Sequence, residues 1–252
     1  MSQLPVNPGI WQTLRMATPA RIGQARAGQG LALSEVLAFQ LAHARARDAV
    51  HAGLDLDALQ AALGGPCLLV KSAAPVRDIY LRRPDLGRRL DDQSRMVLAQ
   101  AAHGPVDLAI VIADGLSATA VQRFAAPLAL RLRELASASG MSMSQNVIAT
   151  QARVALGDDI AAALKARAVL MLIGERPGLS AVDSLGAYFT HAPQPGTTTD
   201  ADRNCVSNIR EGGLSTDDAA ARLLWLITEA RQRGASGVAL KDESALRPLL
   251  PP

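Results

Sequence analysis

The amino-acid sequence predicts an α/β protein built on a doubly wound, mostly parallel sheet. Three apolar runs carry this prediction, at residues 106–113, 146–155 and 168–174. Such runs, bounded by turn residues, are typical of strands that are covered on both faces. Helical segments separate them, and the order strand, helix, strand, helix, strand implies right-handed crossovers and parallel strands. The expected arrangement is Rossmann-like.

The helices of this sheet are predicted from capping residues and from the spacing of apolar side chains. Asp158 and Asp159 suit the positive end of a helix, since acidic side chains stabilise a helix N-terminus. Glycine is typical of helix C-terminal ends. We expect one helix to begin at its cap, Ser117, and to end just before Gly140, and a second to run from 157 to about 167. The last helix is expected from its cap, Ser215 or Thr216, to Gly234.

The remaining segments are less regular. We expect the chain to divide near residue 104, into a helical, loop-rich N-terminal region (1–104) and the α/β domain (105–252). A helix is predicted from Ser34, its cap, to near Gly53. Residues 186–190 are predicted to form an edge strand and 237–240 a short strand. Two segments are predicted to be irregular: an arm at 1–17 and a polar loop at 193–213, a length usual for functional or disordered loops.

Composition narrows the class of protein. The 252 residues carry 26 Lys and Arg against 23 Asp and Glu, an excess too small for a typical nucleic-acid binder. Cys67 and Cys205 match no zinc or disulfide pattern, so we expect two reduced thiols in a cytoplasmic protein. The apolar runs are too short to span a bilayer, which needs about 20 residues.

The carboxyl ends of the predicted strands are the expected ligand site. Three segments should lie at or near that edge: 114–117, 153–158 and 174–178. None of them contains a dinucleotide or P-loop glycine pattern, which disfavours a nicotinamide or ATP enzyme. No nucleophile elbow and no tight group of metal ligands is present either. The periodicity of apolar residues alone therefore indicates an α/β domain that binds a ligand, and it does not identify the function.

Arginines gather around a Pro-Asp turn in residues 80–90. They would suit a phosphate or an acidic protein surface. A solvated turn in an arginine-rich chain fits them equally well. His43 and His51 have no carboxylate or cysteine at ligand spacing and are expected to be ordinary helix residues.

Six short motifs resemble one family in register, from about Thr18 to Lys241. They are Thr18-Pro-Ala-Arg-Ile-Gly, Tyr80-Leu-Arg-Arg-Pro-Asp-Leu-Gly-Arg-Arg-Leu, Ala113-Asp-Gly-Leu-Ser, Gly174-Glu-Arg-Pro-Gly-Leu, Ala201-Asp-Arg-Asn-Cys-Val-Ser-Asn-Ile-Arg-Glu-Gly-Gly and Ala235-Ser-Gly-Val. Together they resemble the small subunit of ethanolamine ammonia-lyase.

This resemblance implies a function that composition could not give. The family's enzyme binds adenosylcobalamin between a large TIM-barrel subunit, which holds the substrate, and a smaller Rossmann-like subunit. It converts ethanolamine to acetaldehyde and ammonia through homolysis of the cobalt–carbon bond. The resemblance also suggests six copies of each subunit. A free cytoplasmic enzyme and one packaged in a bacterial microcompartment are both compatible with the sequence.

The family's cobalamin-contacting positions carry over onto Val154, Glu175 and Cys205, and the resemblance implies no catalytic residue in this chain. The structural alternative for Val154 is an ordinary sheet residue, and for Cys205 it is a packed thiol. For Glu175 it is an ion pair with Arg176 or with the partner subunit. Arg153, Arg176 and Arg203 flank these positions and would meet the cofactor's phosphate or the large subunit.

The motif Asp-x-His-x-x-Gly, in which a protein histidine replaces the base of cobalamin, does not occur in the sequence. We therefore expect base-on binding, in which cobalamin keeps its own lower ligand. A cobalamin-binding or regulatory module without enzymatic activity is the alternative function.

Overall fold

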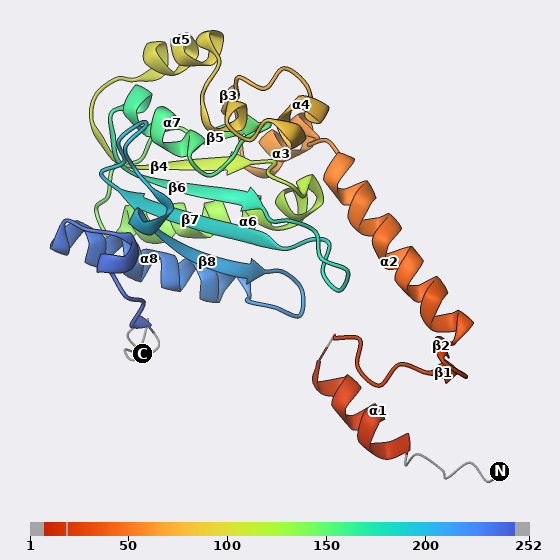
Figure 1. The fold of residues 1–252 in the computed structure, drawn as a ribbon. Helices are drawn as coiled ribbons and strands as arrows, with labels where there is room; N and C mark the ends of the chain where they lie inside the picture. The colour runs from red at the N-terminus through yellow and green to blue at the C-terminus, as the bar shows by residue number, and fades with distance from the viewer. Residues whose placement is uncertain (1–7, 19, 245–252) are drawn as a thin grey trace.

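A six-stranded sheet forms the centre of this computed structural model, which describes residues 8–18 and 20–244 (Figure 1). The first four strands in spatial order are parallel, and the last two alternate in direction. The molecule is thus a mixed α/β protein with a mostly parallel sheet. In spatial order the strands are β3 (Leu68–Lys71), β5 (Val147–Thr150), β4 (Val106–Ala113), β6 (Ala166–Gly174), β7 (Leu185–His191) and β8 (Arg203–Ile209).

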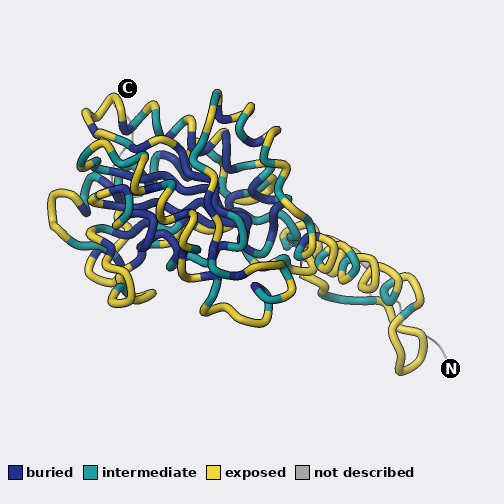
Figure 2. Tube along the Cα trace, turned by 90° about the horizontal axis from the view of Figure 1, so that it is seen from above, coloured by how far each residue is buried: buried dark blue, intermediate teal, exposed yellow. Residues whose placement is uncertain are grey.

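Helices cover both faces of the sheet, and the most buried residues lie between the two layers (Figure 2). One apolar cluster joins the sheet to α3 (Leu56–Ala62), α6 (Ala118–Ala138) and α8 (Thr216–Arg233). The other joins the opposite face to α5 (Asp92–Ala101) and α7 (Leu156–Leu164). The continuous apolar pattern of β4 and β6 follows from this double covering.

Side-chain caps begin the two longest helices of the sheet layers, as predicted. The Ser117 hydroxyl accepts a hydrogen bond from the amide of Ala120 at 3.3 Å, and Ser215 accepts one from Asp218 at 3.1 Å. The last helix ends at Gly234, whose φ of 69° is the left-handed conformation common at helix ends.

The strand predicted over 146–155 is shorter than expected. It ends at Thr150 because Gln151 adopts a φ of 55° and turns the chain out of the sheet. The helix that follows ends at Leu164, before a left-handed Lys165, so that residue 167 belongs to β6.

Three predictions for the C-terminal half were wrong. The polar segment 193–213 contains a 3₁₀ turn (Asp200–Asp202) and β8, and this added strand makes β7 an internal strand. Residues 237–240 include a 3₁₀ turn (Gly237–Ala239) in place of a strand. Gly237 has a φ of 70°, which an extended strand does not allow.

The N-terminal segment extends away from the sheet (Figure 1). It comprises α1 (Pro8–Ala17), a hairpin of β1 (Arg26–Ala27) and β2 (Gly30–Leu31), and α2 (Leu33–His51). The irregular arm predicted for 1–17 is therefore wrong for 8–17, and its first seven residues lie outside the described chain. Helix α2 begins at Leu33 after Ala32, without a side-chain cap, so the predicted cap Ser34 already lies inside the helix.

Residues 54–104 lie against the sheet. Strand β3 pairs with β5, so the sheet extends across the boundary predicted near residue 104. Helix α4 (Arg77–Arg82) and a 3₁₀ turn (Leu86–Arg88) follow β3. Among the described helices, none has both the length and the apolar character needed to cross a membrane.

We expect the burial of β6 between the two helix layers to contribute strongly to the free energy of unfolding. Replacing the fully buried Leu170 by alanine should lower the free energy of unfolding by about 2–5 kcal/mol, because it removes apolar contacts and leaves a cavity. The matched control is Leu130→Ala on α6, where the side chain is 43% exposed and the loss should stay below about 1 kcal/mol. Urea denaturation of both variants measures the difference, and equal losses would contradict the prediction.

Candidate functional site

A pocket of about 440 Å³ lies at the carboxyl ends of β4 and β6. All three segments that the sequence predicted for this edge contribute to it. The structure thus brings together residues of these segments that are up to 61 positions apart in the chain, from Gly115 to Arg176. The lining consists of Tyr80, Gly115, Leu116, Arg153, Val154, Ile173, Gly174, Glu175, Arg176 and Tyr188.

The buried carboxylate of Asp114 organises the edge of the sheet beside this pocket. It follows β4 directly and accepts hydrogen bonds from the backbone amides of Gln151, at 2.8 Å, and Ala152, at 3.1 Å. Arg77 forms an ion pair with it at 3.3 Å. Burial raises the pKa of Asp114, although the backbone amides and Arg77 act in the opposite direction. The carboxylate therefore ties the turn after β5 to the end of β4.

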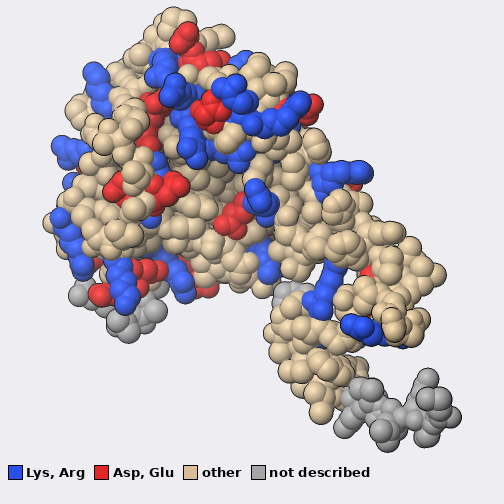
Figure 3. Space-filling model, viewed as in Figure 1, with Lys and Arg blue, Asp and Glu red and all other residues tan. Residues whose placement is uncertain are grey.

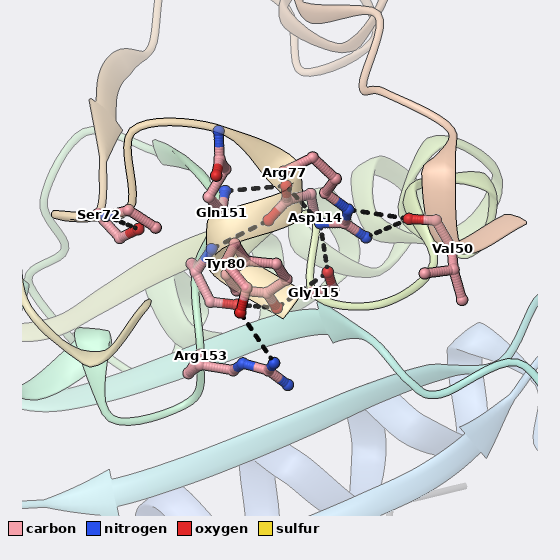
Figure 4. A network of polar contacts seen from close by, with 10 residues as sticks. Val50, Ser72, Arg77, Tyr80, Asp114, Gly115, Gln151 and Arg153 are labelled. Carbon is pink, nitrogen blue, oxygen red and sulfur yellow. Dashed lines mark hydrogen bonds and ion pairs between the residues drawn. The ribbon is translucent and has the colours of Figure 1, made fainter. Parts of the chain in front are cut away.

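Arg77 extends this network from α4 (Figure 4). Its guanidinium donates to the carbonyl of Gly115 at 2.9 Å and to that of Val50 at 2.6 and 2.9 Å. It also lies 4.8 Å from the centre of the Tyr80 ring. A guanidinium has five N–H donors in a fixed plane, so one side chain can connect α2, α4 and the loop after β4.

Tyr80 forms the wall between this network and the pocket. Its hydroxyl lies 3.0 Å from the carbonyl oxygen of Gly115 and 2.9 Å from that of Ala152. The guanidinium of Arg153 stacks over the ring at 4.4 Å, and its Nη2 reaches the Tyr80 carbonyl at 3.4 Å. Burial raises the pKa of the phenol to about 12, and the neighbouring arginines partly oppose the shift.

Glycines allow the loops after β4 and β6 to touch. Gly115 has a φ of 55°, and a side chain there would overlap the carbonyl of Gly174. A side chain at Gly174 would in turn overlap the carbonyl of Ser117. The amide of Leu116 donates to the Gly174 carbonyl at 2.9 Å. The floor of the pocket is therefore backbone in direct contact with backbone.

Val154 and Glu175 both line the pocket. Val154 is partly buried in the turn before α7, and so does not end a strand as predicted. The Glu175 amide donates to the Ser184 carbonyl at 3.0 Å, and the Ser184 hydroxyl donates to the Glu175 carboxylate. The side chain of Glu175 lies over Gly186, where a Cβ atom would be 2.9 Å from its Oε1. Glu175 is thus held at the rim of the pocket.

Cys205 lies one strand farther, and it is not part of the predicted loop. It is exposed on β8, where it pairs with Tyr188, a residue of the pocket wall. The Tyr188 hydroxyl donates a hydrogen bond to the sulfur. Although the residue as a whole is exposed, neighbouring protein atoms partly desolvate its sulfur, which raises the pKa of the thiol; the hydrogen bond from Tyr188 only partly offsets this rise. The thiol is consequently protonated at neutral pH.

Comparison with known proteins identifies the family. A sequence model of the ethanolamine ammonia-lyase light chain matches residues 8–241. An ethanolamine ammonia-lyase small subunit from Ralstonia nicotianae is 55% identical, over 97% of this chain and 92% of its own. The small subunit from Pseudomonas syringae pv. tomato is 53% identical, over 97% of this chain and 86% of its own. The one from Bradyrhizobium diazoefficiens is 55% identical, over 93% of this chain and 91% of its own. The chain belongs to the ethanolamine ammonia-lyase light-chain family.

Three residues of this light chain gain roles in the site that the sequence did not assign. Tyr80 was visible within a motif, but nothing indicated its contact with Gly115, 35 positions away. Arg77 and Tyr188 lie outside the six motifs. Alternation along β7 turns Tyr188 away from the buried Ala187 and Phe189, which is the one sequence signal for its position. Within the described residues no group of His, Cys, Asp and Glu could hold a metal ion.

Tyr80→Phe should change the pH dependence of light-chain stability. Because the folded pKa of about 12 lies above the ordinary value of 10, the neutral phenol stabilises the fold below pH 10. That contribution is lost as the pH rises from 10 to about 12. At pH 8 the variant should lose about 1–3 kcal/mol, because it lacks the one hydroxyl hydrogen that lies between the carbonyl oxygens of Gly115 and Ala152. Urea denaturation between pH 8 and 11.5 should give a shallower decline for the variant than for the wild type, and parallel declines would contradict the assignment.

Proposed function

We propose that this light chain is the cobalamin-holding partner in an adenosylcobalamin-dependent ethanolamine ammonia-lyase, a carbon–nitrogen lyase. The cofactor would lie between the light chain and the large subunit, and the enzyme would convert ethanolamine to acetaldehyde and ammonia. Family membership, the names of the relatives and the six motifs support the proposal. The proposed fold type is Rossmann-like, with its ligand at the carboxyl edge of the parallel strands.

One observation carries the assignment of the site. Val154 and Glu175 line one pocket, and Tyr188 of that pocket contacts Cys205 on the next strand. These residues reach the site from three separate segments of the chain. The pocket of about 440 Å³ suits a drug-sized ligand, so a corrinoid would extend well beyond it. A half-open site of this kind is what a cofactor shared with a second subunit requires.

The chemistry of the lining fits the periphery of a corrin ring, which carries amide side chains. Glu175 accepts from Ser184 through one carboxylate oxygen, which leaves acceptor capacity for amide N–H groups. The Nε of Arg153 is buried without a hydrogen-bond partner among the described residues, and it could donate to an amide carbonyl. An unpaired buried donor is costly, so a bound acceptor would be stabilising. Gly115 and Gly174, which both line the pocket, allow the loops after β4 and β6 to approach each other closely.

This chain's own residues would bind and orient the cofactor and limit its contact with water. When bound, adenosylcobalamin supplies the radical through homolysis of its cobalt–carbon bond. The pocket lining contains no histidine, so the proposal has cobalamin keep its own base as the lower ligand. The groups that contact ethanolamine would belong to the large subunit.

Replacing Glu175 by glutamine should weaken cobalamin binding about tenfold, because one acceptor for amide groups is exchanged for a donor. The matched control is Glu134→Gln, at a side chain that is 70% exposed and remote from the pocket. Equilibrium dialysis of cobalamin against the complex with the large subunit measures both, with detection by visible absorption. Unchanged affinity of the Glu175 variant would remove this residue from the site.

Activity should require both subunits. The light chain together with the large subunit and adenosylcobalamin should release acetaldehyde from ethanolamine, whereas neither subunit should do so alone. Full activity of the large subunit by itself would contradict the proposal. Tight cobalamin binding by the light chain alone, with no effect of the large subunit, would favour the alternative of a non-enzymatic cobalamin-binding module.

A further inference from the structure

A second pocket, of about 580 Å³, lies directly beside the first. The two meet at the start of α7, where Val154 lines the first pocket and Ala155 the second. The second pocket is bounded by the turn before α5, the first turn of α7 and the loop at 195–198. It therefore lies next to the proposed cofactor site without sharing a lining residue with it.

Every carboxylate that lines the second pocket is already neutralised. Asp85 is paired with Arg83 at 2.8 Å, and Asp159 with Arg95 at 2.7 Å. Asp159 also accepts from the amide of Leu90 at 3.0 Å. These two acids therefore have no need of a further cation.

The third carboxylate, Asp158, is bound at 2.7 Å by Arg203, and both side chains are almost completely buried. Thr190 also accepts a hydrogen bond from this guanidinium at 2.9 Å. Because such a buried pair is costly to separate, Asp158 is not free to pair with another arginine.

Two arginines that line the same pocket form none of these ion pairs. The side chains of Arg88 and Arg89 have no hydrogen-bond or ion-pair partner among residues 8–18 and 20–244. The lining residues and their ion-pair partners comprise five arginines and, with Asp200 at 3.7 Å from Arg203, four aspartates. Basic side chains, with acidic ones among them, gather over α5 and α7 (Figure 3). Within the described residues of this pocket, Arg88 and Arg89 are therefore the two guanidinium groups that no carboxylate neutralises.

A third donor faces the same space. Thr198 lines the pocket, and its hydroxyl oxygen already accepts a hydrogen bond from the amide of Gln194 at 2.7 Å. Its hydroxyl hydrogen therefore remains available to donate. Two guanidinium groups and a hydroxyl suit a tetrahedral oxyanion, because arginine binds phosphate through pairs of parallel N–H bonds.

We propose that Arg88 and Arg89, with Thr198, bind a phosphate group in this second pocket. Its source is either free phosphate or the phosphodiester in the nucleotide loop of cobalamin. The second source rests on the proposed function, and the adjacency of Val154 and Ala155 makes it the favoured one.

The experiment compares three probes on the complex of light and large subunits: cobinamide, which lacks the phosphate, cobinamide phosphate, which keeps it, and inorganic phosphate. The wild-type complex should bind cobinamide phosphate about tenfold to a hundredfold more tightly than cobinamide. The double variant Arg88→Gln/Arg89→Gln should lose this preference and bind cobinamide as before. Visible absorption titrations give the affinities without reference to activity.

A matched control removes the same charge elsewhere. Arg26 and Arg45 are exposed on β1 and α2, outside both pockets, so Arg26→Gln/Arg45→Gln should keep the wild-type preference. Inorganic phosphate is titrated calorimetrically against chloride at equal ionic strength. Binding that depends on Arg88 and Arg89, without a preference for cobinamide phosphate, would identify free phosphate as the ligand.

The proposal would be overturned if the wild-type complex bound no inorganic phosphate and showed no preference for cobinamide phosphate that depends on Arg88 and Arg89. Failure of the proposed function looks different, because the wild-type complex would then bind none of the corrinoids. The calorimetric titration with inorganic phosphate would still test the second pocket in that case.

Discussion

The buried carboxylate of Asp114 is the constraint on which the ligand edge of this protein depends. It accepts hydrogen bonds from two consecutive amides after β5 and pairs with Arg77 of α4. These bonds stabilise the turn at 151–155, in which Gln151 adopts a left-handed φ of 55° that is unfavourable for a residue other than glycine. Because Arg153 and Val154 follow directly, Asp114 helps to set the position of one pocket wall, together with the Tyr80 hydroxyl near Ala152 and the bond from the Arg153 amide to the Gly87 carbonyl.

The two faces of the sheet are covered unequally, and this leaves room for a ligand. On one face, Val206 and Ile209 of β8 pack into the cluster that contains α8. On the other face, the cluster beneath α5 and α7 includes Tyr188 of β7 but no residue of β8. Cys205 is consequently exposed on that face, next to Tyr188. The apolar cluster on that face therefore ends at Tyr188, which also lines the pocket.

The sequence predicted the centre of the fold better than its margins. Strands β4 and β6 were recognisable because burial on both faces makes their sequences continuously apolar. Strand β8 was missed because only Val206 and Ile209 among its apolar residues are buried, between polar neighbours. The edge rule for parallel strands correctly brought together the three predicted segments. Arg77 and Tyr80 could not be placed in that way, because their partners are 27 to 72 positions distant and depend on how α4 packs.

Under the proposed function, the openness of the site links cofactor binding to subunit assembly. A pocket of about 440 Å³ contacts one part of a corrinoid, and the neighbouring pocket with Arg88 and Arg89 would contact another. The remaining surface of the cofactor would stay in water until the large subunit covers it. If both subunits contact cobalamin, the complex binds it more tightly than either subunit alone. By thermodynamic linkage, bound cobalamin then strengthens the association of the two subunits by the same factor. A half-site on a rigid sheet edge thereby makes assembly and cofactor loading one coupled equilibrium.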